Sequence, residues 1–169
     1  VAFFILSTQL SGEQFFLAAT TLAGVINFFG VPASILGNEL ALKLGRQHWI
    51  CIVMITSAIL GVSLAYSMGH AGWLIVALAI GHAIFIMADS ATLTAGLVTS
   101  ANEKLKGAAM GLHSLMGFGG GLLGPAIFGF VLDLTGSQSD RVSWIWAYVS
   151  IVIWGVLFVL YQRRRGWGT

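Results

Sequence analysis

The chain has 169 residues, of which 57% are hydrophobic and only 8% are charged. A soluble domain carries roughly a quarter charged residues, so this composition excludes an ordinary soluble domain. With 8 basic against 6 acidic residues, a nucleic-acid partner has no electrostatic basis. The single cysteine, Cys51, excludes a disulfide framework and a thiolate metal site, and the sequence indicates no cofactor.

Apolar stretches follow one another along nearly the whole chain. The first, 1–10, is expected to be the end of a helix that begins upstream, because Val1 already lies in an apolar run. Five further stretches have about 19 to 28 residues each, near or above the roughly 20 that a helix needs to cross hydrocarbon. They cover 14–36, 49–68, 71–98, 108–132 and 143–161. The predicted fold class is all-α: one polytopic membrane bundle over 1–169, with five complete transmembrane helices plus the end of a sixth, in contact with the lipid bilayer.

The basic residues predict the orientation of these helices, because Lys and Arg in short loops stay on the cytoplasmic side. The loops 37–48 and 99–107 and the C-terminal tail are alternate connections, so they lie on one side. All basic residues except Arg141 are found there: Lys43, Arg46, Lys104, Lys106, Arg163, Arg164 and Arg165. We expect a multi-pass protein of the cell inner (cytoplasmic) membrane with a cytoplasmic C-terminus.

Tryptophans mark the same boundaries. An indole ring prefers the headgroup region of a bilayer. The starts of three predicted spans carry Trp49, Trp73, Trp144 and Trp146. We therefore expect these four rings to lie at the membrane interfaces.

Glycines are concentrated in the 108–132 span. Gly117 with Gly121, and Gly120 with Gly124, repeat the four-residue spacing that lets two helix backbones approach closely in lipid. This face is expected to pack against another helix. Pro125 follows directly and removes a backbone donor, so the segment either packs statically or bends and slides during a conformational cycle.

Two residues distinguish the 14–36 span. Pro32 is expected to break the helix in the same way as Pro125. Asn27, in the middle of the span, either binds a substrate or bridges helices. A bent span suits a protein that changes conformation.

Asp89 is the only side chain in the five predicted spans that is charged at neutral pH. Burying a charge at a helix centre costs about 2.5–3.5 kcal/mol on insertion scales, so Asp89 is expected to face a cavity or a partner. One interpretation places it in a substrate or proton pathway. The other is a protonated or hydrogen-bonded aspartate that caps a helix break near Ser90, Thr92 and Thr94.

Two histidines are candidate partners of Asp89. His82 precedes it by two helical turns and projects from the same helix face. At 1.5 Å per residue, Asp89 and His113 lie roughly 7 Å and roughly 9 Å to the cytoplasmic side of the midplane on sequential helices. Carboxylates and imidazoles that exchange protons are the usual parts of proton-coupled transporters. The predicted pathway therefore contains Asp89, His82, His113, its neighbour Ser114, and Asn27, although each histidine taken alone fits a hydrogen-bonded core residue slightly better.

The stretch NELALKLGRQ at 38–47 resembles a degenerate copy of the signature loop of the major facilitator superfamily, G-x-L-A-D-R-x-G-R-[KR]. Gly45 and Arg46 match, and Lys43 replaces the first Arg. Leu42 replaces the acidic residue, and Asn38 stands in place of the first Gly. The segment from Ala88 to Asp133 is also similar to helices ten and eleven of bacterial members.

The resemblance implies that the chain is the C-terminal half of such a transporter, from the end of helix seven to helix twelve. It implies a fold of two six-helix bundles around a cavity that opens alternately to each side, so the missing N-terminal half would be a partner. Lys43, Gly45 and Arg46 would be gating residues. The expected function is secondary active transport of a small-molecule substrate, with protons as the candidate coupling ion. No enzymatic activity is expected.

Two other classes compete with transport. In a redox protein, His82 and His113 would bind a haem or a quinone, but their estimated depths differ by roughly 12 Å, too far to flank one iron. In an intramembrane hydrolase, Ser114 would be the nucleophile, but it lies outside a Gly-x-Ser-x-Gly elbow. The sequence indicates neither the substrate nor the direction of transport.

Overall fold

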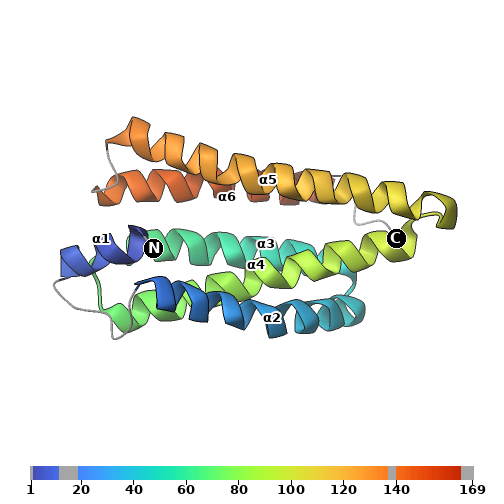
Figure 1. Cartoon of the computed structure of the whole chain (residues 1–169), viewed down its shortest axis with the longest axis horizontal. Coiled ribbons are helices and arrows are strands. Elements are labelled where there is room, and N and C mark those ends of the chain that lie inside the picture. Colours follow the sequence, from blue (N-terminus) through green and yellow to red (C-terminus); the bar gives the residue numbers. More distant parts are fainter. Residues whose placement is uncertain (1, 12–18, 137–139, 165–169) are drawn as a thin grey trace.

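The computed structural model describes residues 2–11, 19–136 and 140–164 (Figure 1). The elements are α1 (Ala2–Ser11), α2 (Ala19–Leu44), α3 (Arg46–Tyr66), α4 (Gly72–Ser100), the short 3₁₀ helix η1 (Glu103–Leu105), α5 (Lys106–Thr135) and α6 (Arg141–Arg164). These ranges contain no strand, so the predicted all-α fold class is confirmed. Within them, 5 helices are long and apolar enough to cross a membrane, which indicates a membrane-embedded protein.

The long helices run along one common axis and form two layers (Figure 1). In one layer α4 packs against both α2 and α3, and in the other α5 packs against α6. The layers are joined mainly through α3 and α6, because α4 and α5 touch at few places. This arrangement leaves hollows where α3, α4, α5 and α6 approach one another.

The helices are longer than the apolar stretches predicted. The expected loop at 37–48 is almost entirely helical, since α2 continues to Leu44 and α3 starts at Arg46. Only Gly45 interrupts them, with a φ of +85° that favours glycine. Both Pro32 and Pro125 lie inside continuous helices, so neither ends its helix. The first residues of the predicted 14–36 span lie outside the described part of the chain.

The glycines that bring helices together differ from those predicted. A Cβ added to Gly37 of α2 would lie 2.5 Å from the carbonyl oxygen of Ala88 on α4, and one at Gly30 would lie 2.6 Å from Met87. A Cβ added to Gly117, Gly120, Gly121 or Gly124 would have no atom of another described helix within 4 Å. The expected packing of the α5 glycine face therefore does not occur within the described chain, and the close crossing is that of α2 with α4.

Two of the four tryptophans expected at the interfaces are buried in the bundle. Trp49 packs with Ala41, Val53 and Ala88, and its indole nitrogen has no hydrogen-bond partner among the described residues. Trp144 packs in the larger core cluster, edge to face with Phe3 and Phe128. Both rings fill space between helices, and both lie in the first turns of their helices, α3 and α6. Trp73 and Trp146 are exposed, as an interfacial ring requires.

Candidate functional site

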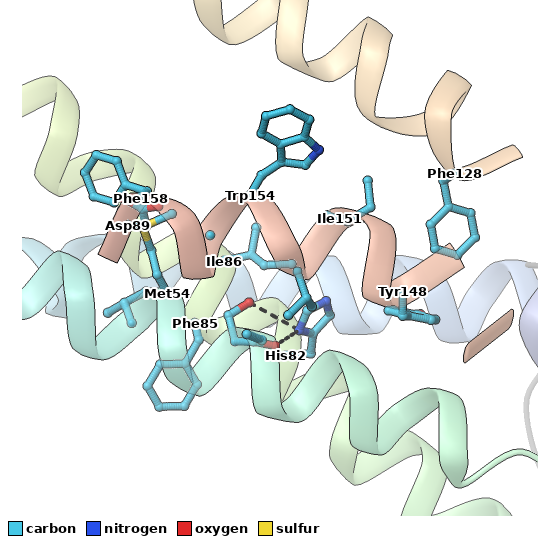
Figure 2. Close-up of a pocket in the computed structure, with 15 residues that line it drawn as sticks. Met54, His82, Phe85, Ile86, Asp89, Phe128, Tyr148, Ile151, Trp154 and Phe158 are labelled. Carbon is cyan, nitrogen blue, oxygen red and sulfur yellow. Dashed lines mark hydrogen bonds between the residues drawn. The ribbon is translucent and has the colours of Figure 1, made fainter. Parts of the chain in front are cut away.

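A cavity of about 610 Å³ lies between α3, α4 and α6, with one residue of α5 in its wall (Figure 2). Its size is that of a small-molecule site. Most of the wall is apolar or aromatic, and polar atoms come from only a few side chains. The residues that line it are Val53, Met54, Ser57, Ala58, His82, Phe85, Ile86, Asp89, Phe128, Tyr148, Ile151, Val152, Trp154, Gly155 and Phe158.

Asp89 lines this cavity from α4. One carboxylate oxygen, Oδ1, is buried and has no hydrogen-bond partner among the described residues. The helix is unbroken from Gly72 to Ser100. The nearby hydroxyls bond back along that helix, Thr92 to the carbonyl of Ala88 and Thr94 to that of Ser90, each at 3.0 Å. The structure therefore offers no helix break for Asp89 to cap, and Asp89 is instead part of the cavity wall.

His82 lines the same cavity two turns earlier on α4 (Figure 2). Its Nδ1 lies 3.0 Å from the Ser57 carbonyl oxygen and 3.3 Å from the Ser57 hydroxyl oxygen, both on α3. Because a carbonyl only accepts hydrogen bonds, this contact assigns the proton of a neutral ring to Nδ1 and leaves Nε2 as an acceptor. The Tyr148 ring lies edge-on to the imidazole at 6.3 Å. His82 and Asp89 thus share a cavity, although no hydrogen bond joins them in the described chain.

A second hollow of about 820 Å³ adjoins the first and shares His82, Phe128 and Tyr148 with it. Several residues singled out in the sequence meet there. Asn27 comes from α2, and Gly124 and Pro125 come from α5. The proline on α5 therefore borders the hollow beside His82, so a bend at this point would change the shape of the site.

His113 lies elsewhere. Its Nε2 is 3.3 Å from the Thr94 hydroxyl oxygen, and it lines a separate hollow together with Arg46. Ser114, its neighbour, is exposed and lines none of these three hollows. The structure therefore brings His82 and Asp89 to one cavity, and Asn27 to the hollow beside it, whereas His113 and Ser114 are not part of either.

The predicted gating residues lie where α2, α3 and α4 meet. Arg46 Nη1 donates a hydrogen bond of 2.6 Å to the Thr99 hydroxyl, and its side chain covers Gly96. A cation beside the last turn of α4 also favours the carbonyl end of that helix. Lys43 is exposed in the last turn of α2. Arg46 therefore ties the start of α3 to the end of α4.

Sequence reasoning missed Ser57 and the aromatic wall of the cavity. Ser57 lies inside an apolar run, and a hydroxyl in a helix gives no periodic signal. Tyr148, Trp154 and Phe158 lie in a helix that is apolar all round, so composition could not separate cavity-facing rings from lipid-facing ones. Among the described residues, no group of three His, Cys, Asp or Glu side chains is placed to hold a metal ion.

Comparisons of the chain with protein-family models, with curated proteins and with solved structures give no match. The resemblance of the 38–47 segment to a transporter signature therefore remains an expectation. A function has to be inferred from the cavity and from the side chains that line it.

Proposed function

We propose that this chain belongs to a secondary transporter, which moves a small solute across the membrane by alternating access. The observation that carries the proposal is the Asp89 carboxylate, which lines a cavity among membrane-spanning helices and has one buried oxygen without a hydrogen-bond partner among the described residues. A carboxylate within a membrane-spanning helix is costly unless it faces a cavity or a partner, and such residues mark substrate, ion or proton pathways. The motif at 38–47 supports the same class, and the one-sided distribution of basic residues fits a multi-pass membrane protein.

The neighbouring elements suit a cavity that changes shape. Pro125 removes a backbone hydrogen bond from α5 beside the second hollow, which lowers the cost of bending there. Arg46 links α3 to α4 through an exposed hydrogen bond, a contact that can break and re-form. In the proposed transporter, a second bundle completes the cavity wall and faces the uncovered surface of this one.

No observation favours the redox alternative. His82 bonds through Nδ1 to Ser57, and His113 bonds through Nε2 to Thr94. The two rings line different hollows, whereas a shared haem would need both at one iron. Transport is the function that the site supports best.

The test is Asp89→Asn in the complete protein, reconstituted in proteoliposomes. A panel of organic solutes is first screened for proton movement with the unaltered protein, and the variant is then measured with the solutes that respond. We expect concentrative transport to fall to the background of empty vesicles, because the amide cannot take up or release a proton. The matched control is Asp133→Asn, which alters an exposed carboxylate near the end of α5 and should leave transport unchanged. Full proton-driven transport by Asp89→Asn would remove this residue from the mechanism.

A further inference from the structure

We propose that the cavity between α3, α4 and α6 binds a lipophilic organic monocation, with its charge beside Asp89 and its apolar or aromatic body against the rings of α6. This inference rests on the proposed function and names the substrate class of the same site. It depends on the charge of the lining, on its aromatic content and on the shortage of other polar groups.

The charge of the lining selects a cation. Among the described residues that line the cavity there is neither Lys nor Arg, and Asp89 is the only acid. Its Oδ1 is buried without a hydrogen-bond partner in that part of the chain. A carboxylate removed from water is stabilised by a counter-charge and repels an anion. One positive charge on the occupant balances the one carboxylate.

The aromatic rings select a lipophilic body. Phe158 of α6 lies on the Asp89 side of the cavity, Trp154 lies near its middle, and Tyr148 and Phe128 lie at the other end, beyond His82 (Figure 2). Tyr148 and Phe128 already contact each other edge to face, with ring centroids 5.2 Å apart. The electron-rich faces of such rings attract an organic cation and bury its apolar groups. The occupant thus combines one positive charge with an apolar or aromatic body.

The other ligand classes find no matching groups. A sugar needs many hydrogen-bond partners, whereas only a few described lining side chains carry polar atoms, and Nδ1 of His82 is already bonded to Ser57. A divalent metal ion needs several oxygen or nitrogen ligands, and the described residues hold no cluster of three candidate side chains. A neutral apolar molecule would leave the Asp89 carboxylate in the lining without a counter-charge.

Equilibrium binding of tetraphenylphosphonium tests this proposal. The complete protein is placed in lipid nanodiscs, radiolabelled probe is titrated, and the uptake of empty nanodiscs is subtracted. The isosteric anion tetraphenylborate and the neutral triphenylphosphine oxide are measured in the same way. We expect saturable binding of the cation alone. Saturable binding of the anion at similar affinity, or none of the cation, would overturn the proposal.

Variants locate the binding in this cavity. Asp89→Asn is expected to weaken cation binding by about tenfold or more, because the counter-charge is lost from a desolvated site. Asp89→Glu keeps the charge and should retain most of the affinity, which separates a charge effect from misfolding. Trp154→Ala should weaken binding by about two- to fivefold, as expected for loss of one cation–π contact. Asp133→Asn is the control without effect, and an unchanged affinity in Asp89→Asn would place the site elsewhere.

Flux measurements keep this inference separate from the proposed function. If the cation binds at Asp89 but proteoliposomes carry no solute across the membrane, transport is wrong and the binding site stands. If the protein transports other solutes through Asp89 and does not bind the cation, transport stands and this substrate class is wrong.

Discussion

Gly37 shows how one residue sets the distance between two helices. Gly37 has no Cβ, and the backbone of Ala88 occupies the space that a Cβ would need. The contact is with backbone, so no flexible side chain can move aside. The close crossing of α2 and α4 thus requires glycine at position 37. Helix α4 is the one that carries Asp89 and His82.

We predict that Gly37→Ala lowers the free energy of unfolding by about 1–3 kcal/mol, the usual cost of overpacking a tight contact. The matched control is Gly120→Ala, whose new methyl group enters open space and should change stability by less than about 1 kcal/mol. Denaturant unfolding of both variants in detergent, followed by far-ultraviolet circular dichroism, measures the difference. Equal stability losses in the two variants would contradict this assignment of the packing face.

Asp89 was recognisable from the sequence because one acid in a long apolar stretch is conspicuous and costly. The structure places it on a cavity, as that cost leads one to expect. The Ser57 contact with His82 could not be predicted, because it joins α3 to α4 and depends on how the two helices are rotated. Residue type therefore identified the charged member of the site, and packing decided its neighbours.

At the scale of elements, the number and type of helices followed from the apolar stretches, but their ends did not. Hydropathy falls at Asn38, Glu39 and Lys43, so a loop was expected there. Glu, Leu, Ala and Lys are all good helix formers, and α2 continues through them after the apolar stretch ends. The glycine spacing on α5 likewise indicates that another helix could pack closely there, but it does not identify which helix does so.

The contact between Arg46 and Thr99 joins the start of α3 to the end of α4. We predict a coupling free energy of about 0.5–1.5 kcal/mol between these side chains, the range for one hydrogen bond. A double-mutant cycle with Arg46→Gln and Thr99→Val, scored by unfolding in detergent, measures it. Strictly additive effects would show that the contact contributes nothing to the junction.

For the whole molecule, the turns that join α2 to α3 and α4 to α5 lie at the same end of the bundle as the C-terminal end of α6 (Figure 1). That end carries Lys43, Arg46, Lys104, Lys106, Arg163 and Arg164, whereas Arg141 lies at the other end and donates a hydrogen bond to the Tyr66 carbonyl. The bundle therefore has one basic end, as a protein with its basic loops in the cytoplasm would have.

We predict that the basic end is cytoplasmic. In a Cys51→Ala background, intact cells treated with a membrane-impermeant maleimide should label His70→Cys and leave Lys104→Cys unlabelled. Both residues are exposed, at opposite ends of the bundle. Permeabilised cells should label both, which controls for reactivity. The reverse pattern in intact cells would invert the predicted topology.

The connection between α2 and α3 consists of Gly45 alone. A link of one residue provides no flexible loop between the helices, so a tilt of either helix is transmitted to the other at this junction. The turn between α4 and α5 is longer and contains η1. The pair α2 and α3 should therefore behave as a stiff hairpin and a fixed frame, against which α5 is freer to swing.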